Sequence, residues 1–304
     1  MSQKTVYFVV GPTAVGKTAF AIRLAKYLET EIISADSRQF FHEMRIGTAM
    51  PSEDELKAVK HHLIGNLSIH EKYNVSTFEQ EALQLIQTLF QKKNAVVIVG
   101  GSGLYLEALA FGIDDLPDAS EELRMQLKKQ YDNEGIEVLQ KQLQKLDPDF
   151  YAKIDKQNPK RLLRALEVCL TSGKTYSELR LGKKKKRDFT IRWIGLEQDR
   201  IKLNEKINLR VDRMLESGLL EEVNKLYPFK HLNALNTVGY KELFAWLDKE
   251  ESFEWAVEKV KTNSRRYAKR QMTWFRKNEE INWFKVDDLT DMEDLLTQLK
   301  KNDK

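Results

Sequence analysis

Glycine, lysine and threonine at fixed spacing near the amino end form the motif with the clearest chemistry in this sequence. Residues 11–18, GPTAVGKT, fit the pattern G-x-x-x-x-G-K-T. The glycines let successive backbone N–H groups point inward, Lys17 adds a point charge for terminal phosphates, and the Thr18 hydroxyl can ligate Mg²⁺. An apolar run at 6–10 predicts a strand before the motif, and an amphipathic stretch at 19–28 predicts a helix after it. We therefore expect this phosphate-binding loop (P-loop) to bind a di- or triphosphate.

An acidic residue follows the next apolar run. Residues 31–35, EIISA, predict a second buried strand, and Asp36 comes directly after it. Because the carboxyl ends of neighbouring parallel strands share one edge of a sheet, Asp36 would project beside the P-loop. A carboxylate there could hold Mg²⁺ or act as a general base; a helix-capping or turn aspartate is the structural alternative.

The third predicted strand, 95–99, ends in glycines where many P-loop ATPases have an acidic residue. The segment GGSG at 100–103 would offer a ligand its backbone and the Ser102 hydroxyl, although a tight turn from strand to helix would need the same glycines. A motor-type ATPase is therefore disfavoured.

Composition limits the classes of protein that this chain can be. Its 304 residues include 41% apolar and 32% charged residues, enough for one large domain or two smaller ones. The longest apolar runs are too short to cross a bilayer, and the first predicted strand leaves no room for a signal peptide. The one cysteine, Cys169, excludes an internal disulfide and lies in an apolar helical pattern that predicts burial, and the histidines fit no metal motif. We expect a cytoplasmic protein with no membrane contact.

Positive charge is concentrated in two segments. Residues 156–187 carry eleven lysines and arginines against two glutamates, and residues 259–277 carry eight with no acid, although the whole chain has a net charge of only +4. Such segments are expected on a surface that binds a polyanion. Arg161 and Arg164, three residues apart on a predicted helix, could bind phosphates or form a solvated helix face. The basic run 183–187 could contact a nucleic-acid backbone or remain a solvated loop.

Periodicity predicts an α/β core interrupted by a helical insertion. Residues 41–75 look irregular, and a helix is expected from Ser76 behind a capping box with Glu79. Further helices are expected within 118–186, at 201–226 with a break at Gly218, from Tyr240, and at 253–277, and further strands at 189–196 and 281–286. We predict an α/β fold with a P-loop NTPase-like parallel sheet core. Its parts would be 1–115 (core), 116–188 (all-helical insertion domain) and 189–304 (core).

Seven segments, spread over almost the whole chain, occur together and in this order in one known family. They are GPTAVGKT at 11–18, SADSRQ at 34–39, GGSGLYL at 100–106, NPKRLLRALE at 158–167, RVDRMLESGLLEEV at 210–223, TVGYKE at 237–242 and NSRRYAKRQMTWFR at 263–276. In this set the chain closely resembles the bacterial-type tRNA dimethylallyltransferases (tRNA isopentenyltransferases). A P-loop alone would be weak support, whereas the whole set is highly specific.

The resemblance implies a P-loop core with an inserted helical domain that acts on the tRNA anticodon stem-loop. The expected reaction transfers dimethylallyl from dimethylallyl diphosphate to the exocyclic N6 amine of the adenosine immediately 3′ of the anticodon. The family favours tRNAs that read codons beginning with U. The P-loop would hold the donor's diphosphate with Mg²⁺ in place of ATP, and the protein is expected to be a monomer.

The resemblance also implies roles for single residues. Asp36 would be the general base on the amine, Gln39 and its neighbours would read the flipped-out base, and Arg210, or Arg213 in its place, would contact the diphosphate. Ser102 stands where many members have threonine, which keeps the hydroxyl. The predicted catalytic residues are Lys17, Asp36, Ser102 and Arg210. The diphosphate would contact Gly11, Pro12, Thr13, Ala14, Val15, Gly16, Lys17 and Thr18, with Thr18 also on the metal. The tRNA would contact Asp36, Ser37, Arg38, Gln39, Ser102, Arg124, Lys160, Arg161, Leu162, Leu163 and Arg164.

Two other functions share parts of the pattern. A small-molecule or nucleoside kinase has the P-loop and can have a helical insertion, but it has no use for two basic segments. A non-catalytic RNA-binding module could keep a degenerate P-loop, but the intact GKT at 16–18 and Asp36 disfavour it.

Overall fold

The computed structural model describes residues 3–182, 184–287 and 293–298. The chain forms two compact units, a core unit of Met1–Ala110 with Arg187–Lys304 and a helical unit of Phe111–Lys186. None of the helices in the described part of the chain is both long and apolar enough to cross a membrane.

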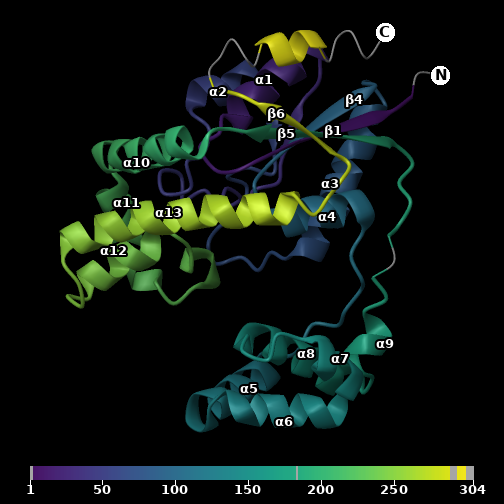
Figure 1. Ribbon diagram of the computed structural model, residues 1–304, viewed down its shortest axis with the longest axis vertical. Helices are drawn as coiled ribbons and strands as arrows, with labels where there is room; N and C mark the ends of the chain where they lie inside the picture. The colour runs from purple at the N-terminus through teal and green to yellow at the C-terminus, as the bar shows by residue number, and fades with distance from the viewer. Residues whose placement is uncertain (1–2, 183, 288–292, 299–304) are drawn as a thin grey trace. The chain divides into compact units, whose positions relative to one another are not determined.

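A six-stranded parallel sheet forms the centre of the core unit, as the sequence predicted (Figure 1). The strand order is β3-β2-β4-β1-β5-β6, so the strand before the P-loop lies inside the sheet with neighbours on both sides. The strands are β1 (Thr5–Val10), β2 (Ile32–Ser34), β3 (His61–His62), β4 (Ala95–Val99), β5 (Thr190–Glu197) and β6 (Ile281–Lys285).

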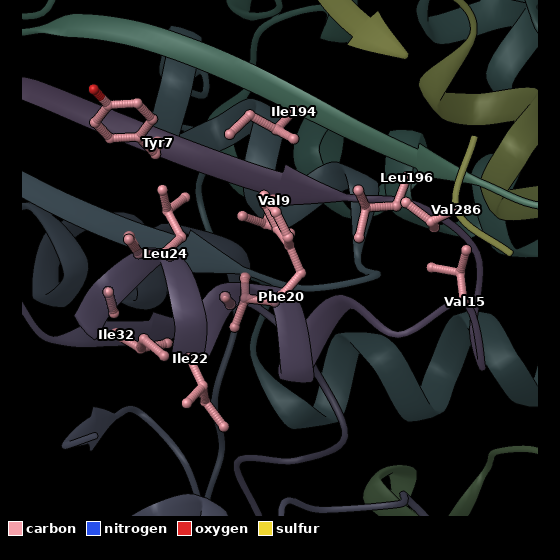
Figure 2. Close-up of a cluster of buried hydrophobic side chains, with 14 of the residues drawn as sticks. Tyr7, Val9, Val15, Phe20, Ile22, Leu24, Ile32, Ile194, Leu196 and Val286 are labelled. Atoms are coloured by element: carbon pink, nitrogen blue, oxygen red, sulfur yellow. The ribbon is translucent and has the colours of Figure 1, made fainter. Parts of the chain in front are cut away.

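Apolar residues at alternate strand positions bury the sheet against α1 (Lys17–Tyr27). Val9 lies in one buried cluster with Phe20 and Leu24 of α1, and all three are at most 1% exposed. Figure 2 shows the two α1 side chains directed at β1. Since α1 begins at the P-loop lysine, this packing fixes the loop relative to the strand ends.

The remaining helices of the core unit surround the sheet and extend away from it (Figure 1). Gly218, with φ at 97°, separates α10 from α11 at the predicted break. The longest helix is α13, which packs along α10 and α12. These helices include α2 (Glu53–Ala58), α3 (Val75–Phe90), α4 (Gly103–Phe111), α10 (Arg200–Glu216), α11 (Leu219–Leu226), α12 (Tyr240–Leu247) and α13 (Phe253–Phe275), with short 3-10 turns η1 (Tyr227–Phe229) and η2 (Asn233–Leu235). Residues 293–298 are also helical.

Two sequence-based predictions in the first half of the core unit were wrong. The segment 41–75 is not irregular throughout, because it contains α2 and the two-residue edge strand β3. Helix α3 is capped by Asn74, whose side chain accepts the Thr77 N–H at 2.9 Å, and not by Ser76. Glu79, the expected partner in that cap, instead binds Arg187 in an ion pair of 2.6 Å.

Arg187 belongs to the core unit and not to a solvated basic loop. Its side chain is 10% exposed, and besides Glu79 it donates to the carbonyl oxygens of Ala108 and Leu109 at 2.8 and 2.9 Å. The backbone N–H of Lys185 donates to the carbonyl oxygen of Phe111 at 2.6 Å. These contacts explain why the helical unit spans 111–186, whereas the sequence placed the insertion at 116–188.

In the described part of the helical unit, all regular secondary structure is helical. Its own core contains Leu127, Leu139, Leu143 and Leu162, each at most 2% exposed. Pro148 and Pro159 occupy the first turns of two of its helices, where a missing N–H costs nothing. The helices are α5 (Glu121–Glu134), α6 (Ile136–Leu146), α7 (Pro148–Lys153), α8 (Pro159–Ser172) and α9 (Tyr176–Leu179).

Candidate functional site

A cavity of about 480 Å³ lies where β2 and β4 end beside the P-loop. It is the position at which open parallel sheets bind ligands. Its walls combine loop backbone, basic side chains and one carboxylate from segments far apart in the chain. The residues with a predicted role that line it are Thr13, Ala14, Gly16, Lys17, Thr18, Asp36, Gln39, Arg210 and Arg213.

The P-loop needs its glycines for two different reasons. Gly16, with φ at 102°, is the residue that caps α1, in a conformation that disfavours larger side chains. Gly11 makes room for the neighbouring strand, since a Cβ there would lie 2.4 Å from the Leu196 carbonyl oxygen. Gly11, Pro12 and Val15 do not line the cavity, and the Val15 side chain is buried in the core. Of the predicted diphosphate contacts, the structure brings five to the cavity.

Lys17 lines the cavity, and its pKa is lowered there. Its Nζ donates to the Pro12 carbonyl oxygen at 2.8 Å. Removal from water lowers the pKa of Lys17 to about 8; the carboxylate of Asp36 opposes this shift and the guanidinium of Arg210 adds to it. A bound anion would favour the charged form further, so this lysine is suited to a phosphate.

Arg210 of α10 supplies a second cation. Its Nη2 donates to the Thr13 hydroxyl at 2.6 Å, which joins α10 to the P-loop. Its Nε is buried and has no hydrogen-bond partner among the described residues. Arg213, one turn further along α10, is exposed at the cavity edge. The sequence left open which arginine contacts a phosphate, and the geometry favours Arg210.

Asp36 is the carboxylate of the cavity and also forms a local turn. Its Oδ1 accepts the Arg38 N–H at 3.1 Å, as the structural alternative anticipated. Within the described part of the chain, no donor is hydrogen-bonded to Oδ2. Asp36 thus faces the cavity with one oxygen held and the other able to accept a proton.

Ser102 lies beside Asp36 but does not line the cavity. Its Oγ accepts the Ser37 N–H at 2.9 Å and donates to the Ser37 hydroxyl at 3.0 Å. The phenol of Tyr267 in α13 also hydrogen-bonds with the Ser102 hydroxyl. Burial, and after it the charge of Asp36, raises the pKa of Tyr267. The phenol therefore stays protonated and able to donate a hydrogen bond.

The glycines after β4 make room for neighbouring parts of the core unit. A Cβ on Gly100 would lie 2.3 Å from the Ala35 carbonyl oxygen. On Gly101 it would lie 2.1 Å from Nε2 of Gln271, and on Gly103 it would lie 2.3 Å from the Trp274 ring. Gln271 and Trp274 are one turn apart on α13, so this helix packs directly on the turn. These three glycines therefore allow Ala35 and α13 to pack closely against the turn after β4.

Two other residues predicted to contact tRNA hold the cavity wall together. Arg38 donates to the carbonyl oxygens of Asn233 and Ala234, both at 3.0 Å, so its guanidinium is committed to η2. Gln39 lines the cavity, and its Nε2 donates to the carbonyl oxygens of Thr48 and Ala49 at 3.1 and 3.0 Å.

The TVGYKE segment supports the loop after Gln39. Glu222 of α11 accepts the N–H groups of Ile46 and Gly47 at 2.8 and 2.9 Å and the Tyr240 hydroxyl at 2.6 Å. A Cβ on Gly47 would lie 2.6 Å from the Tyr240 ring. Sequence reasoning missed Glu222, Tyr267 and Gln271 as supports of the site, because their partners lie far away in the chain.

The predicted tRNA contacts in the helical unit fall into three groups. Lys160 and Arg161 are exposed on α8. Arg124 and Arg164 both contact the carboxylates of Asp118 and Glu167 within 4 Å. Leu162 is fully buried and Leu163 packs on the same core, so both side chains serve the packing of α8, and a contact of these two residues with tRNA stays a prediction.

A magnesium ion would find oxygen donors in the cavity. Thr18 and Asp36 line it, and Mg²⁺ takes many of its ligands from substrate phosphates and water. The residues therefore fit a metal held largely by a bound diphosphate. In the described ranges, no three histidine, cysteine or acidic residues cluster in a way that could hold a metal by themselves.

Comparisons with known proteins assign the chain to a family. A sequence model described as IPP transferase matches residues 39–278. The tRNA dimethylallyltransferase of Christiangramia forsetii is 50% identical over 92% of this chain and 93% of its own length. The tRNA dimethylallyltransferase 1 of Bacteroides thetaiotaomicron is 48% identical over 95% and 94%.

Solved structures agree with the sequence matches. The tRNA isopentenylpyrophosphate transferase of Bacillus halodurans aligns with a TM-score of 0.70 at 36% identity, over 98% of this chain and 96% of that one. A eukaryotic dimethylallyltransferase, whose structures show it acting on tRNA, aligns with a TM-score of 0.81 at 26% identity, over 98% and 77%. The chain belongs to the IPP transferase family.

Proposed function

We propose that this chain is a tRNA dimethylallyltransferase. It transfers a dimethylallyl group from dimethylallyl diphosphate to the exocyclic N6 amine of the adenosine immediately 3′ of the anticodon, in tRNAs that read codons beginning with U. The products are N6-isopentenyladenosine in tRNA and diphosphate. The observation that carries the proposal is the shared cavity, in which Asp36 faces the P-loop residues Lys17 and Thr18 together with Arg210.

Asp36 acts as the general base. The amine nitrogen attacks the allylic carbon of the donor, the bond from that carbon to the diphosphate oxygen breaks, and Asp36 takes the proton that the nitrogen loses. The oxygen Oδ2 suits this step, because Oδ1 is held by the Arg38 N–H. Ser102 and Ser37 support the backbone next to Asp36.

Lys17, Arg210 and the P-loop backbone stabilise the negative charge of the departing diphosphate. Fixed cations at the position where charge develops are among the largest contributions to such reactions. Thr18 would hold Mg²⁺ together with the diphosphate oxygens. When bound, the ion would neutralise part of the charge on the leaving group.

The acceptor would be held by the basic surfaces. Lys160 and Arg161 are the exposed cations of α8, and Arg124 and Arg164 could exchange their carboxylate contacts for phosphates. The target nucleotide must leave the stacked loop to reach the cavity. We propose that the protein acts as a monomer, in the cytoplasm where its tRNA acceptor is found.

The test uses purified protein, Mg²⁺, unmodified tRNA and radiolabelled dimethylallyl diphosphate. We expect label to enter acid-precipitable tRNA and to appear as N6-isopentenyladenosine after digestion. A parallel reaction contains ATP and nucleosides in place of the prenyl donor. ATP consumption there, without prenyl transfer in the first reaction, would favour a kinase and contradict the proposal.

A further inference from the structure

The side chain of Gln271 joins two loops that serve different substrates in the proposed function. Its Oε1 accepts the N–H of Thr13 in the P-loop at 2.8 Å. Its Nε2 donates to the carbonyl oxygen of Gly101, in the turn after β4, at 3.0 Å. Gln271 is 5% exposed; its contact with Gly101 is buried, and its contact with Thr13 is partly buried.

Each contact ends next to a residue with a role in the site. The Thr13 hydroxyl accepts the hydrogen bond from Arg210 on the diphosphate side. Gly101 precedes Ser102, which binds Ser37 beside the base Asp36. The amide of Gln271 therefore sets the distance between the leaving-group side and the base side of the cavity.

The fit around this amide leaves little freedom. Gly101 has no space for a Cβ against Nε2, and Trp274 fills the corresponding space at Gly103. The Thr13 N–H needs an acceptor and the Gly101 carbonyl oxygen needs a donor. At this side-chain length, only glutamine and a protonated glutamate offer both. Leaving either backbone group unpaired would let its loop move.

We propose that Gln271 is a positioning residue for prenyl transfer, holding the diphosphate loop and the Asp36–Ser102 side of the cavity in register. The proposal rests on the proposed function. Gln271 is not among the residues that line the cavity, and it acts through Thr13 and Gly101. Displacements of about 1 Å between reacting groups cost on the order of 100-fold in rate, so the expected effect falls on kcat.

The experiment measures steady-state transfer by wild type and three variants. Gln271→Met removes both hydrogen bonds at similar size, and we expect kcat to fall by about 10- to 100-fold with KM for both substrates within about threefold. Gln271→Glu keeps the acceptor for Thr13, but as an ion it cannot donate to Gly101. The control is Thr273→Ala at an exposed position of the same helix, which we expect to match wild type.

The pH profile of Gln271→Glu distinguishes positioning from a general loss of structure. Its kcat relative to wild type should rise as the pH falls and the introduced carboxyl gains the proton that it needs for Gly101. We expect burial and the facing carbonyl to raise the pKa of that carboxyl above its ordinary value. A flat ratio would overturn the proposal, and this holds even if Gln271→Met does not fold.

Other outcomes are equally decisive. Wild-type kcat in both variants, or a raised KM with unchanged kcat, would overturn the role of Gln271 and leave the proposed function intact. Absence of transfer by wild type would overturn the proposed function itself.

Discussion

Arg210 of α10 donates from Nη2 to the hydroxyl of Thr13 at 2.6 Å, across 197 positions of sequence. Burial lowers the pKa of Arg210, and the charge of Asp36 opposes this shift. The Nε of Arg210 has no hydrogen-bond partner in the described part of the chain. The buried guanidinium of Arg210, with its unpaired Nε–H beside the P-loop, is therefore suited to bind an anion.

Arg210→Ala should lower kcat/KM for dimethylallyl diphosphate by about 10²- to 10³-fold, since it removes one fixed donor from the leaving group. The matched control, Arg213→Ala, removes an exposed charge from the same helix and should change kcat/KM by less than about fivefold. Steady-state kinetics with varied donor measure both. The opposite ranking would assign the diphosphate contact to Arg213.

The affinity for diphosphate should depend on pH through Lys17. Its pKa is lowered to about 8, so Lys17 is charged below that pH and loses its proton above it. A bound diphosphate favours the charged form, so binding should weaken as the pH rises above about 8, by at most about tenfold per pH unit. Calorimetric titration with inorganic pyrophosphate measures this.

Lys17→Arg is the control for the pH effect, because arginine keeps its charge over the whole range. Pyrophosphate itself titrates in this range, so the relevant quantity is the difference in slope between the two proteins. Equal slopes above pH 8 would contradict the role of Lys17 charge.

Breaking the buried pair of Arg187 and Glu79 should destabilise the core unit. Arg187→Ala leaves Glu79 and the carbonyl groups of Ala108 and Leu109 without this partner, and we expect a loss of about 3–5 kcal/mol in the free energy of unfolding. Lys186→Ala, at the exposed neighbouring position, should change it by less than about 0.5 kcal/mol. Urea denaturation measures both. A loss below about 1 kcal/mol for Arg187→Ala would show that the pair contributes little.

Residues of α8 should divide into RNA contacts and core residues. Replacing Lys160 and Arg161 together by alanine should weaken tRNA binding and lower the slope of log affinity against log salt by about 1.5. Replacing Lys141 and Lys145, exposed on α6, is the charge-matched control and should have a smaller effect. Leu162→Ala should instead cost about 2–5 kcal/mol of stability, because the side chain is fully buried. An unchanged salt slope in the first variant would exclude α8 as an RNA contact.

The parts of the fold that follow local patterns were predictable. The strand, P-loop and helix at the amino end have a continuous apolar run, paired glycines and helical spacing, and the structure contains all three. The break at Gly218 was also visible, because a glycine interrupts an otherwise periodic stretch. By contrast, β3 has two residues and gains its pairing only from the neighbouring strand β2, which no local pattern reveals.

The site was predictable where a residue acts at the cavity itself and not where it acts through a distant partner. Asp36 follows a strand end, so its position at the sheet edge could be predicted. Gln271 looks like any polar residue on an amphipathic helix until Thr13, 258 positions away, is placed against it. Leu162 shares a motif with exposed basic residues, and only the packing of the helical unit separates their roles.

The most direct test of the account is transfer by Asp36→Asn under single-turnover conditions with saturating donor and tRNA. Asparagine keeps the size and an acceptor for the Arg38 N–H but cannot act as the base, so we expect the rate to fall by about 10²- to 10⁴-fold. Binding of pyrophosphate and of tRNA, measured separately, should stay within about threefold of wild type. A transfer rate within about tenfold of wild type would contradict the assignment of Asp36 as the general base.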